Sequence, residues 1–336
     1  MRILVTGASG LIGCHATAAL LDAGHEVAVL ARSPAKVEAA LRPLGRSVGE
    51  VEVVAGDLAD AGSLRRALAG REGLLHGAGI FSPARADAAL LERTNVEGTR
   101  CMLEAAVGAG LARIVHLSSI LALFPPRGPV MTADDPVASP RSMYAITKAR
   151  AETIARELQA RAPITIVYPA AVHGPADPTF SIGPQNVATA LKARRALVTE
   201  GGLPNTDVRD LAALVVAIFA GRVAPARVMA PSFFLTHAEH RALLERITGH
   251  PIRALALPGF VMRLLGRGGD LAQRFGRDVV LTFEAAEVLT RSVPIDDRVA
   301  RAALGREPIP AEQSYRDLIR WMAEAGHLAR ADAGRA

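Results

Sequence analysis

The chain has 336 residues, of which 50% are hydrophobic and 21% are charged, so it has the composition of a globular protein and not of a disordered one. Its formal net charge is +6, but the basic residues are scattered, which argues against a nucleic-acid-binding face. The two cysteines, Cys14 and Cys101, offer no disulfide framework or zinc site. With no membrane-spanning apolar run and no signal sequence before the first expected strand, we expect a cytoplasmic protein without stable membrane insertion.

Short apolar segments alternate with helical segments through the first half of the chain. Apolar strands that alternate with helices predict βαβ units and a parallel sheet covered by helices on both faces. The expected strands span 2–6, 26–31, 51–55, 73–76, 113–117 and 164–168, and the expected helices span 11–23, 34–41, 61–69, 86–109 and 142–162. Residues 1–170 are therefore expected to form a doubly wound α/β domain.

The pattern loosens after Pro169, where residues 173–184 read as a loop rich in glycine and proline. Further along we expect, in order, strand 206–211, helix 211–220, strand 228–230 and helices 237–248, 258–275, 283–289, 296–303 and 311–325. Segment 204–232 is expected to return to the sheet. Segments 171–203 and 233–330 predict a smaller, mostly helical lobe over the carboxyl edge of the sheet, where open α/β sheets bind ligands.

Three glycines lie three residues apart where the first strand gives way to the first helix, at Gly7, Gly10 and Gly13. In such a turn the first glycine lets the chain bend sharply, the second lets the backbone approach a pyrophosphate, and the third lets the helix pack closely on the sheet. Free N–H groups at the start of the helix then face the phosphates. The spacing is G-x-x-G-x-x-G rather than G-x-G-x-x-G. The flanking strand and helix nevertheless favour a dinucleotide site over an ordinary strand-to-helix turn.

Arg32 follows the second expected strand, at the position that contacts the adenine-side ribose of a bound dinucleotide. An acidic residue there binds the ribose hydroxyls of NAD, whereas an arginine accommodates the 2′-phosphate of NADP. The alternative is a solvated surface arginine. The sequence therefore favours NADP(H) over NAD(H) as the cofactor.

Tyr144 and Lys148 lie four residues apart on an expected helix and therefore project from the same face. A lysine ammonium beside a phenol favours the phenolate, so we expect Lys148 to lower the pKa of Tyr144 for proton exchange near neutral pH. Ser118 and Ser119 end the fifth strand, where a serine hydroxyl can hydrogen-bond a carbonyl oxygen. Each of these features alone also fits ordinary helix-surface or loop chemistry.

Together these segments resemble the extended short-chain dehydrogenase/reductase family, in the family's order and over about residues 1–220. The matching stretches are T-G-A-S-G-L-I-G (6–13), G-D-L (56–58), N-V-E-G-T (95–99), L-S-S (117–119), Y-x-x-x-K (144–148) and P-x-x-V-x-G-P (169–175). The chain is most similar to the dihydroflavonol 4-reductase and 3β-hydroxysteroid dehydrogenase-like branch, through A-R-S-P (31–34) and G-D-L-A-D (56–60). The resemblance implies a Rossmann-type dinucleotide-binding domain and a carboxyl-terminal substrate-binding lobe. Many relatives carry arginine before Pro169, where this chain has Tyr168, so any role of that arginine is lost.

The resemblance also implies roles for individual residues. Tyr144 is expected to be the general acid/base, and Lys148 to lower its pKa and hold the nicotinamide ribose. Ser119 is expected to bind the substrate oxygen, with Ser118 as the second candidate. These residues would form a Ser-Tyr-Lys catalytic site.

Cofactor contacts are expected along the same edge of the sheet. Residues 57–58 would hold the adenine, residues 76–79 would line the cofactor, and Asn95 would brace strand four or five. Pro169 and Val172 would face the nicotinamide. The full expected set is Gly7, Ser9, Gly10, Leu11, Ile12, Gly13, Arg32, Asp57, Leu58, His76, Gly77, Ala78, Gly79, Asn95, Ser118, Tyr144, Lys148, Pro169 and Val172.

The leading interpretation is an NADP(H)-dependent oxidoreductase that acts on a carbonyl or secondary alcohol of a fairly apolar small molecule. Dehydratases of the family need an acid and a base beside the strand-five hydroxyl, whereas here Ser119 is followed by I-L-A-L-F (120–124). Stretches 120–124 and 255–265 would give the pocket apolar walls, unless they are simply core. The alternatives are a sugar-nucleotide epimerase or dehydratase with retained NAD, and a non-catalytic NADP-binding regulator. The intact serine, tyrosine and lysine argue against the regulator.

Three further features carry weaker expectations. His237 and His240 have metal-ligand spacing but no third ligand, so no metal site is expected. The apolar stretch 258–265, with arginines beside it, could touch a membrane surface, although packing in the lobe is the simpler reading. Helices 86–109 and 142–162 are long and alanine-rich, and they predict a homodimer.

Overall fold

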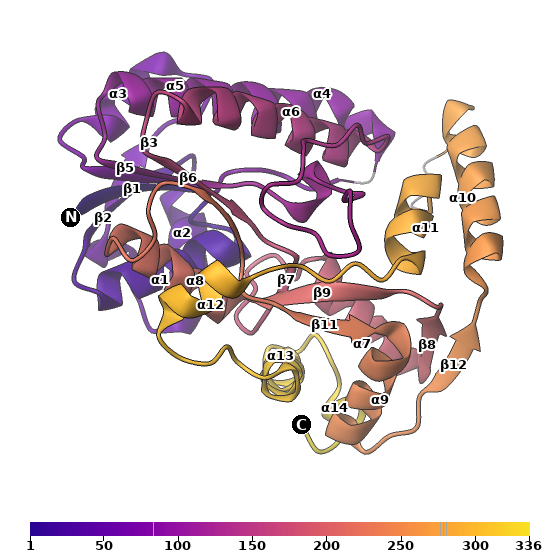
Figure 1. Cartoon of the computed structure of the whole chain (residues 1–336). Helices are drawn as coiled ribbons and strands as arrows, with labels where there is room; N and C mark the ends of the chain where they lie inside the picture. The colour runs from indigo at the N-terminus through magenta and orange to yellow at the C-terminus, as the bar shows by residue number, and fades with distance from the viewer. Residues whose placement is uncertain (83, 276, 278, 280) are drawn as a thin grey trace.

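A seven-stranded parallel sheet forms the centre of the computed structural model, which describes residues 1–82, 84–275, 277, 279 and 281–336 (Figure 1). The strand order is β3-β2-β1-β4-β5-β6-β10, and every neighbouring pair is parallel. The strands are β1 (Arg2–Thr6), β2 (Glu26–Ala31), β3 (Glu52–Ala55), β4 (Gly73–His76), β5 (Arg113–Leu117), β6 (Ile164–Tyr168) and β10 (Arg227–Met229). The order reverses between β1 and β4, so their carboxyl ends flank the crevice at which such sheets bind ligands. The expected doubly wound α/β fold is confirmed.

Helices cover both faces of this sheet (Figure 1). One layer holds α3 (Ala61–Leu68), α5 (Gly98–Gly108) and α6 (Met143–Gln159), and the other holds α1 (Leu11–Asp22), α2 (Pro34–Leu41), α8 (Val208–Phe219) and α12 (Arg298–Leu304). Successive side chains of a strand point to opposite faces, so Ile3 and Val5 pack toward α1 and α8 while Leu4 packs toward α3 and α5. Burial on both faces explains why the strands read as continuous apolar runs.

The helix expected at 86–109 is divided into three parts. It consists of α4 (Ala88–Leu91), the π-helical turn η4 (Glu92–Glu97) and α5. Inside the wider turn, the Asn95 side chain accepts a hydrogen bond from Ile80 N (2.9 Å) and donates to Ile80 O (3.0 Å) and Thr147 Oγ1 (3.1 Å). Such π-turns often occur at functional sites, and this one ties the loop after β4 to α6.

The second half of the chain builds two small sheets that the sequence did not indicate. Strands β7 (Ala171–His173), β9 (Gly202–Asp207) and β11 (Phe233–Thr236) form one, and β8 (Arg195–Val198) pairs in parallel with β12 (Arg253–Ala256) in the other. The strand expected at 206–211 is wrong in its bounds because the Asp207 carboxylate accepts the N–H of Arg209 and starts α8 there. Within segment 204–232, only β10 pairs with the large sheet.

The loop expected at 173–184 ends earlier, because helix α7 (Ile182–Ala193) begins within it. Gly183 and Pro184 favoured a loop over a helix in the sequence. Proline is nevertheless tolerated in the first turn of a helix, where N–H groups have no partner within the helix. The remaining helices of the lobe are α9 (His237–Thr248), α10 (Gly259–Arg274), α11 (Phe283–Thr290), α13 (Ala311–Glu324) and α14 (Arg330–Ala333). A third apolar cluster, which includes Leu191, Leu244 and Leu318, holds α7, α9 and α13 together.

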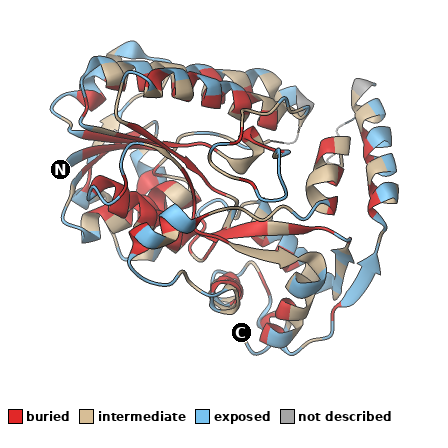
Figure 2. Ribbon diagram, viewed as in Figure 1, coloured by how far each residue is buried: buried red, intermediate tan, exposed pale blue. Residues whose placement is uncertain are grey.

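Burial differs sharply between the parts of the lobe (Figure 2). The strands of the large sheet are mostly buried except at the edge strand β3, whereas β12 is exposed along its length and α10 is exposed on one side. Across the described part of the chain, no helix combines the length and apolar character needed to cross a bilayer.

Candidate active site

The glycine turn between β1 and α1 is shaped by close backbone contacts. Gly7 has φ +83°, and a Cβ on it would lie 2.8 Å from the carbonyl oxygen of Gly77. A Cβ on Gly13 would lie 2.0 Å from Gly7 O, so the third glycine does let α1 pack closely. A Cβ on Gly10 would meet only Gly7 O, at 3.6 Å, which is ordinary contact. The fold therefore requires glycine at positions 7 and 13, but not at position 10. Ser9, Leu11 and Ile12 lie on the same turn.

Arg32 and Asp57 lie together at the carboxyl edge of the sheet, after β2 and β3. The Arg32 side chain is 77% exposed, and its Nη1 lies 3.9 Å from Asp57 Oδ2. Leu58 packs against α5, where a Cβ on Gly98 would approach its Cδ1 to 2.9 Å. An exposed pair at this distance contributes little to stability, so the guanidinium can take another anionic partner at small cost.

His76 does not line the crevice as expected. Its ring is buried and hydrogen-bonds Thr6 Oγ1 (2.8 Å) and Thr99 Oγ1 (3.0 Å), so it ties β1 to α5. Burial lowers its pKa to about 3. The ring stacks on His116 of β5, with centroids 5.5 Å apart. The position of His76 at the end of a strand did not reveal toward which face of the sheet its side chain points.

The loop after β4 passes close to α6. Gly77 N donates to Thr6 O (3.2 Å), and Ala78 N donates to Thr6 Oγ1 (3.2 Å). A Cβ on Gly79 would lie 3.3 Å from Asn95 Oδ1 and 3.7 Å from Lys148 Nζ. The loop, η4 and α6 therefore meet at one point of the crevice.

Tyr144 and Lys148 lie on the first two turns of α6, and Ser119 caps the short helix η5 (Ile120–Ala122) that follows β5. Burial raises the pKa of Tyr144 to about 12, and a hydrogen bond with Ser119 partly opposes this shift. Lys148 Nζ donates to Leu117 O (3.5 Å), and burial lowers the pKa of Lys148 to about 8. The structure brings these three side chains together.

The sequence predicts that Lys148 lowers the pKa of Tyr144, but burial has the larger effect on this phenol. Desolvation dominates at the phenol and raises its pKa, while the ammonium is turned toward the carbonyl of Leu117. Tyr144 therefore holds its proton at neutral pH.

Ser118 and Pro169 directly follow β5 and β6, at the carboxyl edge of the sheet. Ser118 N donates to Val167 O (2.8 Å), and the buried Ser118 Oγ makes no hydrogen bond within the described chain. The carbonyl of Pro169 accepts from Ile120 N (3.1 Å), and Val172 lies on β7 beside β9. Ser118 is thus buried in the strand end, whereas Ser119 contacts Tyr144.

A buried polar network behind Lys148 was not anticipated from the sequence. Glu152 is fully buried, and its Oε1 accepts from Arg156 Nε (2.6 Å) and from the hydroxyl of Tyr168 (2.6 Å). Its charge raises the pKa of Lys148, opposing burial. Arg156 of α6 therefore brings a guanidinium next to Tyr168, the residue that stands where many relatives carry an arginine. The sequence does place polar side chains four residues apart on one face of this helix, at Tyr144, Lys148, Glu152 and Arg156. That spacing was the one sequence pattern that could have indicated the network.

Two more contacts at the site were missed. The Phe81 ring packs edge-on against Tyr144, with centroids 4.8 Å apart. Glu284 of α11 accepts hydrogen bonds from the backbone N–H groups of Arg141 and Ser142, where α6 begins. The lobe therefore holds the amino-terminal end of α6 directly.

An apolar pocket begins immediately after Ser119. It has about 20 Å³ of free space, room for about one water molecule, so a substrate would have to separate its walls. The walls are Ile120, Leu121, Phe124, Met131, Gly202, Leu203, Pro204, Val288, Arg291 and Val293.

The two histidines with metal-ligand spacing make other contacts. His237 Nδ1 hydrogen-bonds Thr199 Oγ1 (2.9 Å), and the His240 ring packs on Tyr315 with centroids 4.8 Å apart. Within the described residues there is no cluster of three potential ligands among histidine, cysteine, aspartate and glutamate.

The chain belongs to the NAD dependent epimerase/dehydratase family, whose model matches residues 3–225. It is 31% identical to sterol demethylase protein B of Methylococcus capsulatus, over 98% of this chain and 100% of that protein. It is 28% identical to a putative dihydroflavonol 4-reductase of Synechocystis, over 96% of this chain and 95% of that protein. Among solved structures, the dTDP-glucose 4,6-dehydratase DesIV of Streptomyces venezuelae, with NAD and TYD bound, aligns with a TM-score of 0.75 at 23% identity, over 98% of this chain and 100% of that one.

These similarities confirm the resemblance to the extended short-chain dehydrogenases/reductases and to their dihydroflavonol 4-reductase-like branch. The protein is an enzyme of the NAD(P)-dependent oxidoreductase type, from a family that binds a nicotinamide cofactor. The residues of the glycine turn fit such a cofactor, because a Cβ at position 10 would meet only Gly7 O, at 3.6 Å, beside the first N–H groups of α1.

Proposed function

We propose that the protein is an NADP(H)-dependent reductase of an apolar carbonyl compound, with Ser119, Tyr144 and Lys148 as its catalytic residues. The observation that carries the proposal is the meeting of Tyr144 with Ser119 at the carboxyl edge of the sheet, beside Lys148 and the loop that contains Gly79. When bound, the nicotinamide supplies the hydride that reaches the carbonyl carbon.

The protein residues move the proton. Ser119 donates a hydrogen bond to the carbonyl oxygen and positions it next to the Tyr144 hydroxyl. Because its pKa lies near 12, Tyr144 is protonated at neutral pH and can donate to that oxygen as the alcohol forms. Lys148, with a pKa of about 8, is mostly protonated at pH 7, and its charge stabilises the phenolate left behind. Asn95 and Glu152 hold the elements that carry these groups.

The preference for NADP(H) rests on Arg32. A charge-assisted hydrogen bond to a 2′-phosphate is worth about 1.5–3 kcal/mol, so Arg32→Gln should weaken NADPH binding at least about tenfold and leave NADH binding unchanged. Arg66→Gln is the matched control, because Arg66 also forms an exposed 3.9 Å pair, with Asp60. Equal affinity of the wild-type protein for NADH and NADPH, measured by fluorescence titration, would overturn the assignment.

The apolar substrate class rests on the pocket after Ser119. Eight of the ten residues that line it are hydrophobic or proline, and Arg291 is the one charged residue among the ten. The related proteins carry names that refer to a sterol and to a dihydroflavonol, both polycyclic compounds. Polycyclic ketones should therefore oxidise NADPH in the presence of the protein, and small polar sugars should not.

A sugar-nucleotide epimerase or dehydratase with retained NAD is the second candidate. The family model and the fold shared with a dTDP-glucose dehydratase favour it. The aliphatic residues after Ser119 disfavour it, because they offer neither the acid nor the base of a dehydration. Denaturing the purified protein and assaying the supernatant separates the two: stoichiometric NAD⁺ release without turnover of any carbonyl compound would favour the epimerase.

The same proposal assigns the parts of the chain. Residues 1–170 bind the dinucleotide, and segments 171–203 and 233–330 bind the substrate.

We also propose a homodimer formed through the layer that contains α5 and α6. Light scattering at micromolar concentration should give twice the chain mass, and a monomer mass would contradict the dimer.

A further inference from the structure

Helix α10 stands at the edge of the lobe, against α11 (Figure 1). The contact is close because two glycines face α11. A Cβ on Gly266 would lie 2.6 Å from Thr282 O, and a Cβ on Gly269 would lie 2.0 Å from Leu281 O. One side of α10 is therefore covered by the start of α11, and the opposite side is exposed to solvent.

The uncovered side of α10 is strongly apolar. Phe260, Leu264, Leu271 and Phe275 are 67%, 64%, 54% and 79% exposed. At about 100° per residue, positions 260, 264, 271 and 275 fall within one narrow stripe along the helix. Scattered exposed hydrophobic residues are ordinary on protein surfaces, whereas an aligned row of large ones marks a site of interaction.

The apolar stripe continues onto the two-stranded sheet before α10. Leu197 of β8 and Leu255 of β12 lie opposite each other in register and are 41% and 49% exposed. Ala196 packs toward the lobe core, so the alternate residues Arg195 and Leu197 face outward. Figure 1 shows β12 leading directly into α10 along the same edge of the molecule.

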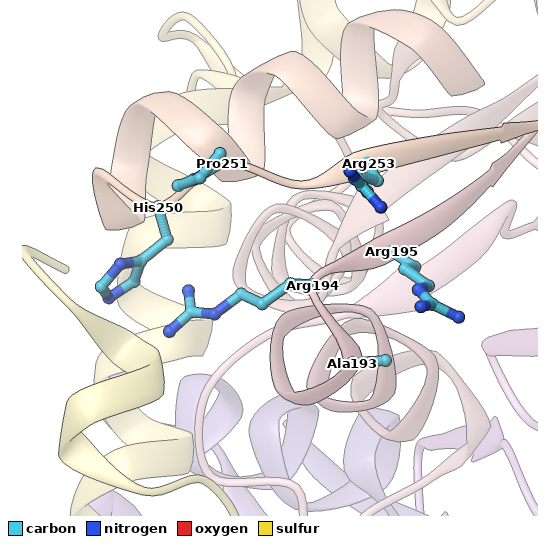
Figure 3. Close-up of a pocket in the computed structure, with 6 residues that line it drawn as sticks. All are labelled: Ala193, Arg194, Arg195, His250, Pro251 and Arg253. Atoms are coloured by element: carbon cyan, nitrogen blue, oxygen red, sulfur yellow. The ribbon is translucent and has the colours of Figure 1, made fainter.

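Positive charge accompanies this apolar surface. Arg195 and Arg253 lie opposite each other in the β8–β12 pair, an arrangement that is unfavourable without an anion nearby. They line a surface depression of about 410 Å³ together with Arg194 and His250 (Figure 3). Arg267 extends from α10 over the ring of Phe283, at 5.2 Å.

The acidic groups beside α10 are turned to other partners. Within residues 251–275 the sequence has four arginines and one aspartate, a net charge of +3. That aspartate, Asp270, accepts from Phe283 N (3.2 Å), and Glu200 accepts from Gly259 N (2.8 Å) at the start of α10. The uncovered surface therefore combines large apolar side chains with basic ones.

We propose that α10 and the β8–β12 pair form a peripheral docking surface for an anionic phospholipid bilayer. Phenylalanine and leucine on one face with arginines alongside is the composition of helices that lie in the membrane interface. The cations on this surface complement anionic headgroups, and each arginine near such a surface strengthens binding about fivefold. The apolar side chains project from a helix and a strand that stand clear of the core, which allows them to enter the acyl boundary.

This surface is connected to the active site through α11. Val288 of α11 lines the apolar pocket, and Glu284 of α11 binds the start of the helix that carries Tyr144. Docking would place the pocket walls beside the bilayer, from which a lipophilic substrate would enter. This last step rests on the proposed function, whereas bilayer binding itself does not.

The test is sedimentation of the full chain with vesicles of phosphatidylcholine, with and without phosphatidylserine. We expect binding to the phosphatidylserine vesicles that weakens in high salt. Phe260→Ser/Leu264→Ser should reduce it at least about tenfold, and Arg195→Gln/Arg253→Gln at least about tenfold. The matched control is Leu90→Ser/Val299→Ser, which removes two exposed hydrophobic residues elsewhere and should bind like wild type.

Three outcomes would overturn the proposal. They are absence of wild-type binding to either vesicle, equal binding to both vesicles at all salt concentrations, and binding that survives both double substitutions. If Phe260→Ser/Leu264→Ser instead changes only the mass in light scattering, the surface joins two copies of the chain and the bilayer proposal is wrong. Circular dichroism confirms that each variant is folded. Because the assay needs no substrate, its failure leaves the proposed reductase function untouched, and failure of the carbonyl assay leaves bilayer binding untouched.

Discussion

Replacement of Arg156 by leucine should destabilise the protein by about 3–5 kcal/mol, the usual cost of leaving a buried charge without its partner. Glu152 is completely buried, and Arg156 supplies the only cation among the described contacts of its carboxylate. After the substitution, the carboxylate would retain only the hydroxyl of Tyr168. Guanidinium chloride denaturation followed by circular dichroism measures the free energy of unfolding.

The matched control is Arg150→Leu on the same helix. Arg150 pairs with Glu92 at 2.8 Å, but its side chain is 58% exposed, so the loss should stay below about 1 kcal/mol. The combined variant Glu152→Leu/Arg156→Leu/Tyr168→Phe should recover most of the loss, since it removes every polar member of the network. If Arg156→Leu costs no more than Arg150→Leu, the buried pair does not exist as described.

The other predictions concern chemistry, the glycine turn and pH. Tyr144→Phe should lower the turnover number about 10²–10⁴-fold with cofactor affinity unchanged; wild-type turnover would refute its role as the acid. Gly13→Ala should unfold or strongly destabilise the protein, because its Cβ would lie 2.0 Å from Gly7 O, whereas Gly10→Ala should fold normally and lose cofactor affinity. Thermal melting and cofactor titration separate these two results, and equal behaviour of both variants would contradict them. His76 has a depressed pKa of about 3 in the folded protein, so the stability that it contributes above about pH 6.5 is lost as the pH falls, by about 2 kcal/mol at pH 5. Denaturation at several pH values should show this slope, and His76→Gln should remove only its own part, because burial also lowers the pKa values of His116, His173 and His240.

Local patterns in the sequence were enough to predict the large sheet and the meeting of Ser119, Tyr144 and Lys148 at its carboxyl edge. Strands buried on both faces are continuous apolar runs between turn residues, and Tyr144 and Lys148 are related by a single helical turn. Contacts between distant segments were not predictable in this way. The pairing of β8 with β12 joins short strands far apart in sequence, and the partners of Glu152 include Tyr168, which lies on a different element. His76 was misplaced because its position at a strand end does not reveal the threonines that enclose it.

The position of β10 limits how this enzyme could be recombined with its relatives. The chain leaves the large sheet after β6, builds part of the lobe, and returns as β10 to complete the sheet edge beside β6. Helices α8 and α12 then seal one face with side chains such as Leu214 and Ala300. A fragment ending after β6 would expose the full hydrogen-bonding edge of a fully buried apolar strand, which favours aggregation. The lobe therefore cannot be exchanged as a module by one crossover, and a chimaera needs junctions on both sides of β10 and α12.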